Sequence, residues 1–277
     1  MSLIFLTNNS HGDGMPTIKL QHTEMHYQVT GTGEPILLIH GLAVDSNTWL
    51  ALAPYLKAHF QLIRYDLRGS GQTQFDGQPF GLADLAQDIV ELLDQLQIER
   101  AHIIGHSMGG MIARYFAAQY TERVKRLVLV HSRIKKNWLS TRFWEGLLAL
   151  REKYDLAPEE VVNLVMPLGY SNSFLADDNK VKAIRTVVKQ NRYPQSLQSF
   201  RLQAEAVADF DASEYTSHLT MPTLLTAGTA DILAPSQDIY ENAQALQNAV
   251  FVEQQNGAHA PHVETPEWLA EQILKFL

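Results

Sequence analysis

The segment Ile103-Ile104-Gly105-His106-Ser107-Met108-Gly109-Gly110-Met111 decides the fold of this chain. Its apolar start predicts a strand over residues 101–104, and the residues after Gly110 follow a helical pattern. Between them lies a G-x-S-x-G sequence, the tight strand-to-helix turn that holds a serine hydroxyl above the edge of a sheet. Glycine stands on both sides of Ser107 because a Cβ there would collide with the neighbouring strand or helix. The same five residues also occur in ordinary glycine-rich connections, so the residues around them decide the interpretation.

Strands and helices alternate on both sides of this turn. Short apolar runs bounded by turn residues predict strands at 17–20, 25–29, 36–39, 61–66, 101–104, 126–130, 222–227 and 249–252. Apolar residues with a 3.6-residue period predict a helix over 82–96, and a shorter helix is expected after residue 45 with Ser46 or Asn47 as its N-cap. The alternation predicts an α/β fold with a mostly parallel, doubly wound central sheet of about eight strands.

The character of the chain changes between residues 132 and 211. Strand-like runs disappear, proline and glycine interrupt helical stretches, and aromatic residues are frequent. We expect a helical cap, inserted after the sixth strand and lying over the sheet; the alternative is a set of peripheral helices with a small core of their own. The predicted domains are therefore 1–131 (the first part of the core, with 1–15 a loose leader), 132–211 (the cap) and 212–277 (the second part of the core).

Composition narrows the functional class. The chain has 277 residues, a formal net charge of −8 and no cysteine. No basic stripe suits a nucleic-acid partner, and the lack of cysteine excludes a thiol nucleophile and fits a reducing compartment. The N-terminus lacks the features of a signal peptide, and no apolar run approaches the roughly 20 residues that span a bilayer. We expect a cytoplasmic protein with no membrane span; its oligomeric state is not predicted.

A serine nucleophile needs a neighbouring base and a third group that orients the base. Ser107, Asp231 and His259 follow one another in the chain, and each comes just after a predicted strand. Because the carboxyl ends of parallel strands meet at one edge of a sheet, these residues can converge there. Asp238 is an alternative acid, but it falls inside a predicted helix. His262 is an alternative base that composition alone does not separate from His259.

Five short motifs in this order resemble the α/β-hydrolase fold superfamily, in particular its lid-bearing carboxylesterases and enol-lactonase-like serine hydrolases. The motifs are His40-Gly41, the loop Asp66–Gly71, Gly105–Gly110, Gly228-Thr229-Ala230-Asp231, and Gly257-Ala258-His259 followed by Glu264-Thr265-Pro266. The resemblance favours His259 as the catalytic histidine, since it precedes the Glu-x-Pro sequence by five residues. It also assigns one oxyanion-binding N–H to Leu42, and the start of the helix after Ser107 supplies the other at Met108.

Together these features predict a serine hydrolase that needs no cofactor and binds no metal. It would cleave a carboxylic ester, thioester or lactone of a small-to-medium, mainly apolar substrate through an acyl-enzyme. The alternatives are a carbon–carbon bond hydrolase, which Ala260 after the histidine disfavours, a perhydrolase, or a ligand sensor that keeps the triad but turns over little. His40 and His106 are expected to brace loops, and the other histidines, His131 among them, show no metal-ligand spacing.

Overall fold

The computed structural model describes residues 16–277, so the predicted leader at 1–15 lies outside the described residues. One sheet runs through this part of the chain, in the order β1-β2-β4-β3-β6-β7-β8-β9, with β5 paired to β2. The strands are β1 (Thr17–Lys19), β2 (Thr23–Thr30), β3 (Glu34–Ile39), β4 (Phe60–Tyr65), β5 (Gln74–Phe75), β6 (Ala101–His106), β7 (Val124–Val130), β8 (Thr223–Gly228) and β9 (Ala249–Gln254). Strands β3, β4 and β6 to β9 pair in parallel, whereas β1, β2 and β5 pair antiparallel.

The predicted α/β sheet is confirmed, with one addition. Each of the eight expected strands has its counterpart, and β5 is a ninth that the sequence pattern does not indicate, because two residues carry no periodicity. With β5 counted, the predicted cap follows the seventh strand, β7, rather than the sixth.

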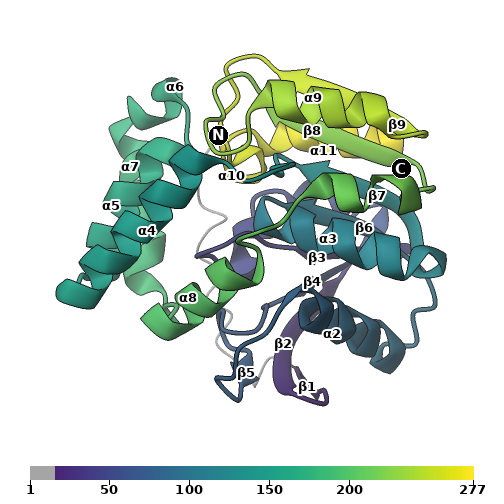
Figure 1. Cartoon of the computed structure of the whole chain (residues 1–277), viewed down its shortest axis with the longest axis horizontal. Helices are drawn as coiled ribbons and strands as arrows, with labels where there is room; N and C mark the ends of the chain where they lie inside the picture. Colours follow the sequence, from purple (N-terminus) through teal and green to yellow (C-terminus); the bar gives the residue numbers. More distant parts are fainter. Residues whose placement is uncertain (1–15) are drawn as a thin grey trace.

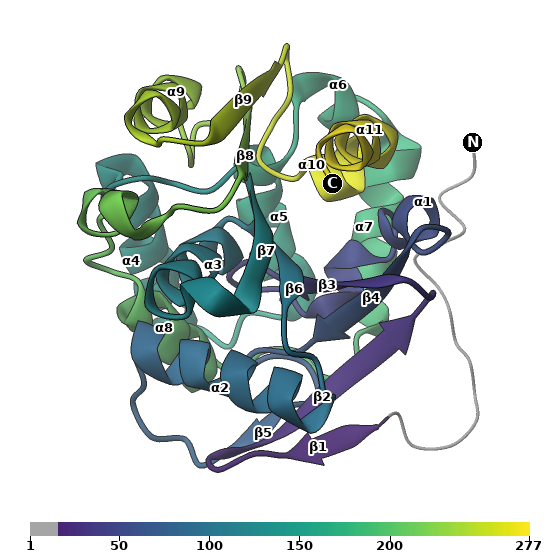
Figure 2. The ribbon, with the colours of Figure 1, turned by 90° about the vertical axis from the view of Figure 1, so that its right-hand side faces the viewer.

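Helices cover both faces of the sheet (Figure 2). On one face lie α2 (Leu82–Gln95), α3 (Met108–Gln119) and α9 (Ser236–Ala245); on the other lie α1 (Ala53–Leu56) and α11 (Pro266–Phe276). Alternate strand residues serve the two faces, as the two-residue period of a strand requires. Leu37 and Ile39 pack in the core beneath α2 and α3, while Ile36 and Leu38 pack against the residues of α1 and α11.

The segment after β3 differs from the expected helix. It forms a single 3-10 turn (Ser46–Trp49), and only later the short α1. Asp45 is the N-cap, because its carboxylate accepts the N–H of Asn47. The backbone N–H of Ser46 is instead donated to Asp66 at 2.9 Å. The prediction of Ser46 or Asn47 as the cap residue is therefore wrong, because the Asp45 carboxylate, at the preceding position, already accepts the N–H of Asn47.

Residues 132–211, all of them described, contain five helices and no strand. The helices are α4 (Trp138–Lys153), α5 (Pro158–Gly169), α6 (Asn172–Leu175), α7 (Asp178–Gln190) and α8 (Leu197–Ala206). They stand beyond one end of the sheet, on the left of Figure 1. Met166, Phe174 and Ile184 form a small core within α5, α6 and α7, and α4 contacts α8 through Trp144 and Phe200. We call residues 132–211 the cap.

The last segments return to the sheet. Two 3-10 turns (Ala212–Glu214 and Thr216–His218) lead into β8, and α10 (Pro261–Glu264) precedes α11. In residues 16–277 no helix has the length and apolar character needed to cross a membrane.

Candidate active site

Ser107 lies at the junction of β6 and α3 in a backbone conformation that is unusual for a residue with a side chain. Its φ is 52° and its ψ is −119°. Such a conformation costs about 1–3 kcal/mol and persists only where the surroundings impose it. The Ser107 N–H donates to the carbonyl of Val130 at 3.0 Å, and the Ser132 hydroxyl donates to the Ser107 carbonyl at 2.9 Å. Both backbone groups of Ser107 are thus anchored to the neighbouring strand end.

The two glycines of the turn are required by close backbone contacts. A Cβ added to Gly105 would lie 2.2 Å from the carbonyl oxygen of Gly109. A Cβ added to Gly109 would lie 2.2 Å from the carbonyl oxygen of Ile39, in β3. Helix α3 therefore starts directly against the strands, and this close approach raises Ser107 above the sheet edge.

The structure brings Ser107, His259 and Asp231 together. The Oγ of Ser107 lies 2.8 Å from Nε2 of His259, and Nδ1 of His259 lies 2.8 Å from Oδ2 of Asp231. The register of the parallel strands explains the convergence, since His106 pairs with Val130 and Val130 pairs with Thr226. Strands β6, β7 and β8 consequently end side by side.

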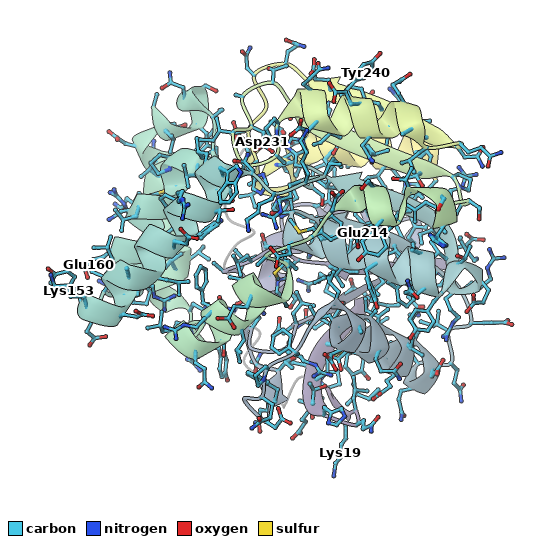
Figure 3. All side chains as sticks on the ribbon, viewed as in Figure 1. Lys19, Lys153, Glu160, Glu214, Asp231 and Tyr240 are labelled. Atoms are coloured by element: carbon cyan, nitrogen blue, oxygen red, sulfur yellow. The ribbon has the colours of Figure 1, made fainter. Side chains whose placement is uncertain are left out.

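Asp231 is held as a buried carboxylate. It lies inside the molecule where the core meets the cap (Figure 3), and only 5% of the residue is exposed. Its Oδ1 accepts the backbone N–H groups of Leu233 and Ala234, at 2.9 and 3.0 Å. Burial alone would raise the pKa of Asp231, but its contacts with the rings of His259 and His131 outweigh burial and lower the pKa well below its usual range. The group is therefore ionised at neutral pH.

The two alternative residues are engaged elsewhere. His262 contacts the Thr48 hydroxyl through Nε2, at 2.7 Å, and its ring packs 4.9 Å from that of Trp49. Burial, followed by the charges of neighbouring histidines, lowers the pKa of His262 to about 3, so this ring is neutral. Asp238 lies in α9 and forms an ion pair with Lys135 at 3.2 Å. Neither residue takes part in the Ser107–His259–Asp231 arrangement.

The loop that carries His259 is bound to both the core and the cap. The Nε2–H of His106 donates to the carbonyl of His259 at 2.8 Å. On the cap side, the N–H of Ala260 donates to the carbonyl of Gly169 at 3.1 Å. The Glu264 carboxylate accepts the N–H of Ser171 at 3.0 Å and also its hydroxyl. His259 is thus fixed from two sides.

Leu42 and Met108 lie where the sequence analysis expects oxyanion-binding N–H groups. Met108 is the first residue of α3, and Leu42 follows Gly41, where an added Cβ would lie 3.4 Å from the Ser107 Cβ. Among the described residues, neither backbone N–H donates a hydrogen bond to another part of the protein. Both N–H groups are therefore without an acceptor in the described part of the protein.

The loop after β4 is a brace for this region. Asp66 accepts hydrogen bonds from the N–H groups of Ser46 and Gln72 and contacts Nδ1 of His26 at 3.0 Å. Burial raises the pKa of Asp66, but these hydrogen bonds lower it to about 2. His40 links the same loop to the Leu42 loop, because its Nδ1–H donates to the Gly41 carbonyl and its Nε2 accepts the Leu67 N–H.

The sequence analysis did not single out His131, and the structure places it beside Asp231. Its Nδ1 lies 3.4 Å from Oδ2 of Asp231, and the residue is fully buried. One sequence signal could have identified it: His131 comes directly after β7, which lies in the sheet between the strand before Ser107 and the strand before Asp231.

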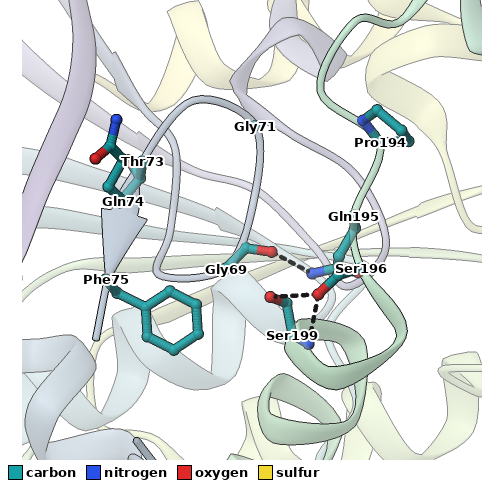
Figure 4. Close-up of a pocket in the computed structure, with 9 residues that line it drawn as sticks. All are labelled: Gly69, Gly71, Thr73, Gln74, Phe75, Pro194, Gln195, Ser196 and Ser199. Atoms are coloured by element: carbon teal, nitrogen blue, oxygen red, sulfur yellow. Dashed lines mark hydrogen bonds between the residues drawn. The ribbon is translucent and has the colours of Figure 1, made fainter. Parts of the chain in front are cut away.

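A separate cavity of about 380 Å³ lies where the cap meets the loop after β4 (Figure 4). Its lining is Gly69, Gly71, Thr73, Gln74, Phe75, Pro194, Gln195, Ser196 and Ser199. Gln195 crosses this seam and donates through Nε2 to the carbonyl of Gly69 at 2.9 Å. The lining includes none of Ser107, Asp231 and His259, so this cavity belongs to the seam between cap and core. Within residues 16–277, no group of three or more potential ligand side chains could hold a metal ion.

A family profile and two relatives of known name agree on the family that this chain resembles. The profile of the alpha/beta hydrolase fold matches residues 34–266, most of the chain. A protein of Azorhizobium caulinodans named carbamate hydrolase RutD is 29% identical over 264 residues, which cover 95% of this chain and 98% of the relative. A pimeloyl-[acyl-carrier protein] methyl ester esterase of Vibrio vulnificus is 28% identical over 262 residues, covering 92% and 98% of the two chains.

Solved structures agree on the fold. The crystal structure of the enol-lactonase from Burkholderia xenovorans LB400 superimposes with a TM-score of 0.84 at 24% identity, covering 94% of this chain and 99% of that one. At this identity the likeness establishes the fold and leaves the substrate open.

Proposed function

The chain belongs to the alpha/beta hydrolase fold family, and from this premise we propose that it is a serine hydrolase of carboxylic esters, thioesters or lactones. The observation that carries the proposal is the continuous arrangement of Ser107 Oγ, the His259 ring and the Asp231 carboxylate, with 2.8 Å at each contact. A nucleophile, a base within hydrogen-bond reach and a group that orients the base are the three parts that serine acyl transfer requires.

In the proposed reaction, Ser107 Oγ attacks the substrate carbonyl while Nε2 of His259 takes the serine proton. The carbonyl oxygen becomes an oxyanion and accepts the N–H groups of Leu42 and Met108, each contributing roughly 3 kcal/mol of transition-state stabilisation. The His259 imidazolium then protonates the leaving alcohol or thiol, and an acyl-Ser107 ester remains. Water, deprotonated by His259, attacks this ester and releases the acid. Asp231 stays ionised throughout and holds the Nδ1–H of His259.

We further propose that the cap, residues 132–211, covers this site and selects substrates. Its Gly169–Ser171 segment hydrogen-bonds to the residues that follow His259, and the many aromatic residues between 132 and 211 favour a mainly apolar acyl group. The names of the two curated relatives, a carbamate hydrolase and a methyl ester esterase, agree with a substrate that presents an acyl carbonyl to the serine.

The test is the Ser107→Ala variant, assayed on p-nitrophenyl esters of increasing acyl length and on a phenyl carbamate. We expect kcat to fall by about 10⁶-fold, as removal of a catalytic serine does elsewhere, and a fluorophosphonate probe to label only the wild type. Ser217→Ala is the matched control, since exposed Ser217 also lies beside a histidine, 3.4 Å from Nδ1 of His218. Near-normal turnover by Ser107→Ala would contradict the proposal, and labelling of the wild type without turnover of any acyl compound would favour the ligand sensor.

A further inference from the structure

His131 occupies a strained and specific position at the end of β7. Its φ is 44°, in the left-handed region that residues with a side chain rarely adopt. Its backbone N–H donates to the carbonyl of Thr226 in β8 at 3.1 Å, which ties the residue to the strand that leads to Asp231. A residue keeps such a conformation only when its surroundings impose it, and such sites often carry a function.

The ring of His131 fits into space that a glycine leaves open. A Cβ added to Gly228, the last residue of β8, would lie 2.9 Å from Cε1 of His131. The ring is completely buried, and neither of its nitrogens makes a well-formed hydrogen bond. Unsatisfied buried ring nitrogens are costly, so their presence calls for an explanation.

The acceptors nearest to this ring belong to the two loops of the proposed triad. The Oδ2 of Asp231 lies 3.4 Å from Nδ1, and the carbonyl of Ala258, the residue before His259, also faces the ring. Oδ1 of Asp231 is already occupied by two backbone N–H groups. Oδ2 is therefore shared between two imidazoles, with His259 at 2.8 Å and His131 at 3.4 Å.

We propose that His131 is a positioning residue for the proposed hydrolase, acting through Asp231. Its Nδ1–H is directed at Oδ2 and restrains the rotation of the carboxylate while His259 gains and loses its proton. Contacts of this kind are often long in a resting enzyme and tighten in the reacting complex. This inference rests on the proposed function, because it gives His131 no role unless Asp231 orients a catalytic base.

The charge state of His131 agrees with this role. Burial lowers the pKa of His131, more than its contact with Asp231 raises it, so the ring is neutral and carries a single N–H. The other titratable groups that act on the ring or on its neighbours are His259, His106 and His262, and burial also lowers the pKa of His106 and of His262. A neutral donor on Oδ2 weakens the hold of Asp231 on the Nδ1–H of His259, and loss of that donor should strengthen the hold on the imidazolium that forms during the reaction.

Two amide variants separate positioning from packing. His131→Asn keeps an N–H donor near the place of Nδ1, and asparagine tolerates the left-handed conformation. His131→Gln moves its amide towards the place of Nε2. We expect His131→Gln to lower kcat about tenfold, the effect of losing one hydrogen bond, with KM within about twofold. When kcat/KM is plotted against pH, it falls on the acidic side, and we call this fall the acidic limb. In His131→Gln the acidic limb should move to higher pH by about half a unit, whereas His131→Asn should keep the acidic limb of the wild type and most of kcat.

His102→Gln is the matched control. His102 is also buried, with 3% of the residue exposed. It lies near the start of β6, at the end of the strand away from Ser107, and its Nε2 is 2.8 Å from the Glu34 carboxylate. Its loss should lower the melting temperature and leave the acidic limb in place. If His131→Gln and His131→Asn both keep the wild-type limb and kcat, or shift the limb equally, the inference is wrong. Should His131→Asn fail to fold, the limb of His131→Gln decides, because only donor loss at Nδ1 is expected to move it. Should His131→Gln fail to fold, a limb of His131→Asn displaced from that of the wild type overturns the inference.

The Ser107→Ala variant, measured in the same series, separates this inference from the proposed function. Turnover by Ser107→Ala would overturn both. Loss of turnover in Ser107→Ala together with wild-type behaviour in His131→Gln would overturn only the role of His131.

Discussion

The sheet edge that carries Ser107, Asp231 and His259 and the cap beyond it are held in place by different means. At the edge, hydrogen bonds of the backbone hold the residues in position. The Ser107 N–H donates to the Val130 carbonyl, and Asp231 accepts two backbone N–H groups. The positions of these groups follow from the strands, which are buried on both faces and cannot shift without breaking the sheet. The geometry of the proposed triad is therefore a property of the core.

The cap is attached mainly by side chains. Gln203, fully buried in α8, donates to the carbonyl of Arg68 at 2.6 Å and to the Ser70 hydroxyl at 2.9 Å. At the other end Ser171 bonds to Glu264, beside one backbone contact from Ala260. Such contacts can be rebuilt with other side chains while the sheet stays unchanged. The comparison implies that chemistry depends on the core, and that substrate choice can vary through the cap.

After the loss of Ser107 itself, the largest expected effect comes from altering the acid at the sheet edge. Asp231→Asn should fold normally but lower kcat by about 10⁴-fold, because an amide favours the wrong tautomer of the neighbouring histidine. The fall in kcat is measured by steady-state hydrolysis of an activated ester. The control is Asp238→Asn, whose carboxylate forms only a half-exposed ion pair with Lys135. Equal activities of the two variants would remove Asp231 from the proposed mechanism.

The next expected effect is on stability, and it differs between an ion pair of the core and one of the cap. Arg68 and Asp88 form a buried pair, with contacts of 2.6 and 2.8 Å and side chains 7% and 3% exposed. Arg68→Leu leaves the carboxylate buried without a partner and should lower the free energy of unfolding by about 3–5 kcal/mol. Arg142→Leu, which removes an exposed pair with Glu145 in α4, should cost no more than about 1 kcal/mol. Urea unfolding measures both, and similar losses would contradict the difference between the regions.

A pH-dependent effect follows from buried His262. Its folded pKa is about 3, lowered chiefly by burial, whereas an unfolded histidine titrates at about 6.5. Because the folded pKa is the lower one, the stability that neutral His262 contributes is complete above about pH 6.5 and is lost as the pH falls towards 3. Between pH 6 and 4.5 this proton alone should lower the free energy of unfolding by about 1.4 kcal/mol per pH unit.

His262→Asn tests that slope. Urea unfolding of both proteins at several pH values should give a shallower pH dependence for the variant, by up to one proton. Parallel slopes would show that His262 does not take up a proton on unfolding in this range. The absolute stability of the variant does not enter the comparison, because only the slope is measured.

The smallest expected effect concerns the cap attachment near His259. Ser171→Ala removes the hydroxyl that caps α6 and bonds to Glu264, and should cost about 1 kcal/mol of stability. Since Glu264 ends α10, the short helix that follows His259, we also expect a small fall in kcat/KM that is larger for long acyl chains. Ser173→Ala is the control, because its hydroxyl contacts that of Ser171 at 2.9 Å but not Glu264. Identical behaviour of the two variants would argue against the coupling of cap and loop.

Much of the core could be predicted because its signals are local. The helix expected over residues 82–96 is α2 (Leu82–Gln95), since its apolar period directly reflects the face that packs on the sheet. The eight expected strands can be recognised in the sequence as apolar runs between turn residues. By contrast, β5 consists of Gln74 and Phe75 and exists only because β2 offers them a partner. The N-cap at Asp45 is a local contact with the N–H of Asn47, which the sequence analysis missed by placing the cap one or two residues too late.

The sequence by itself determined the strand-to-helix turn at Ser107, because the two glycines and the flanking patterns act over a few residues. It also determined the order of Ser107, Asp231 and His259 along the chain, each just after the end of a strand. Only the tertiary structure decided that His262 turns to Thr48 while His259 meets Ser107, and that His131 reaches Asp231. These contacts join segments some 100 or more residues apart, and their distances depend on the register of the parallel strands and on the space that glycines such as Gly228 leave open.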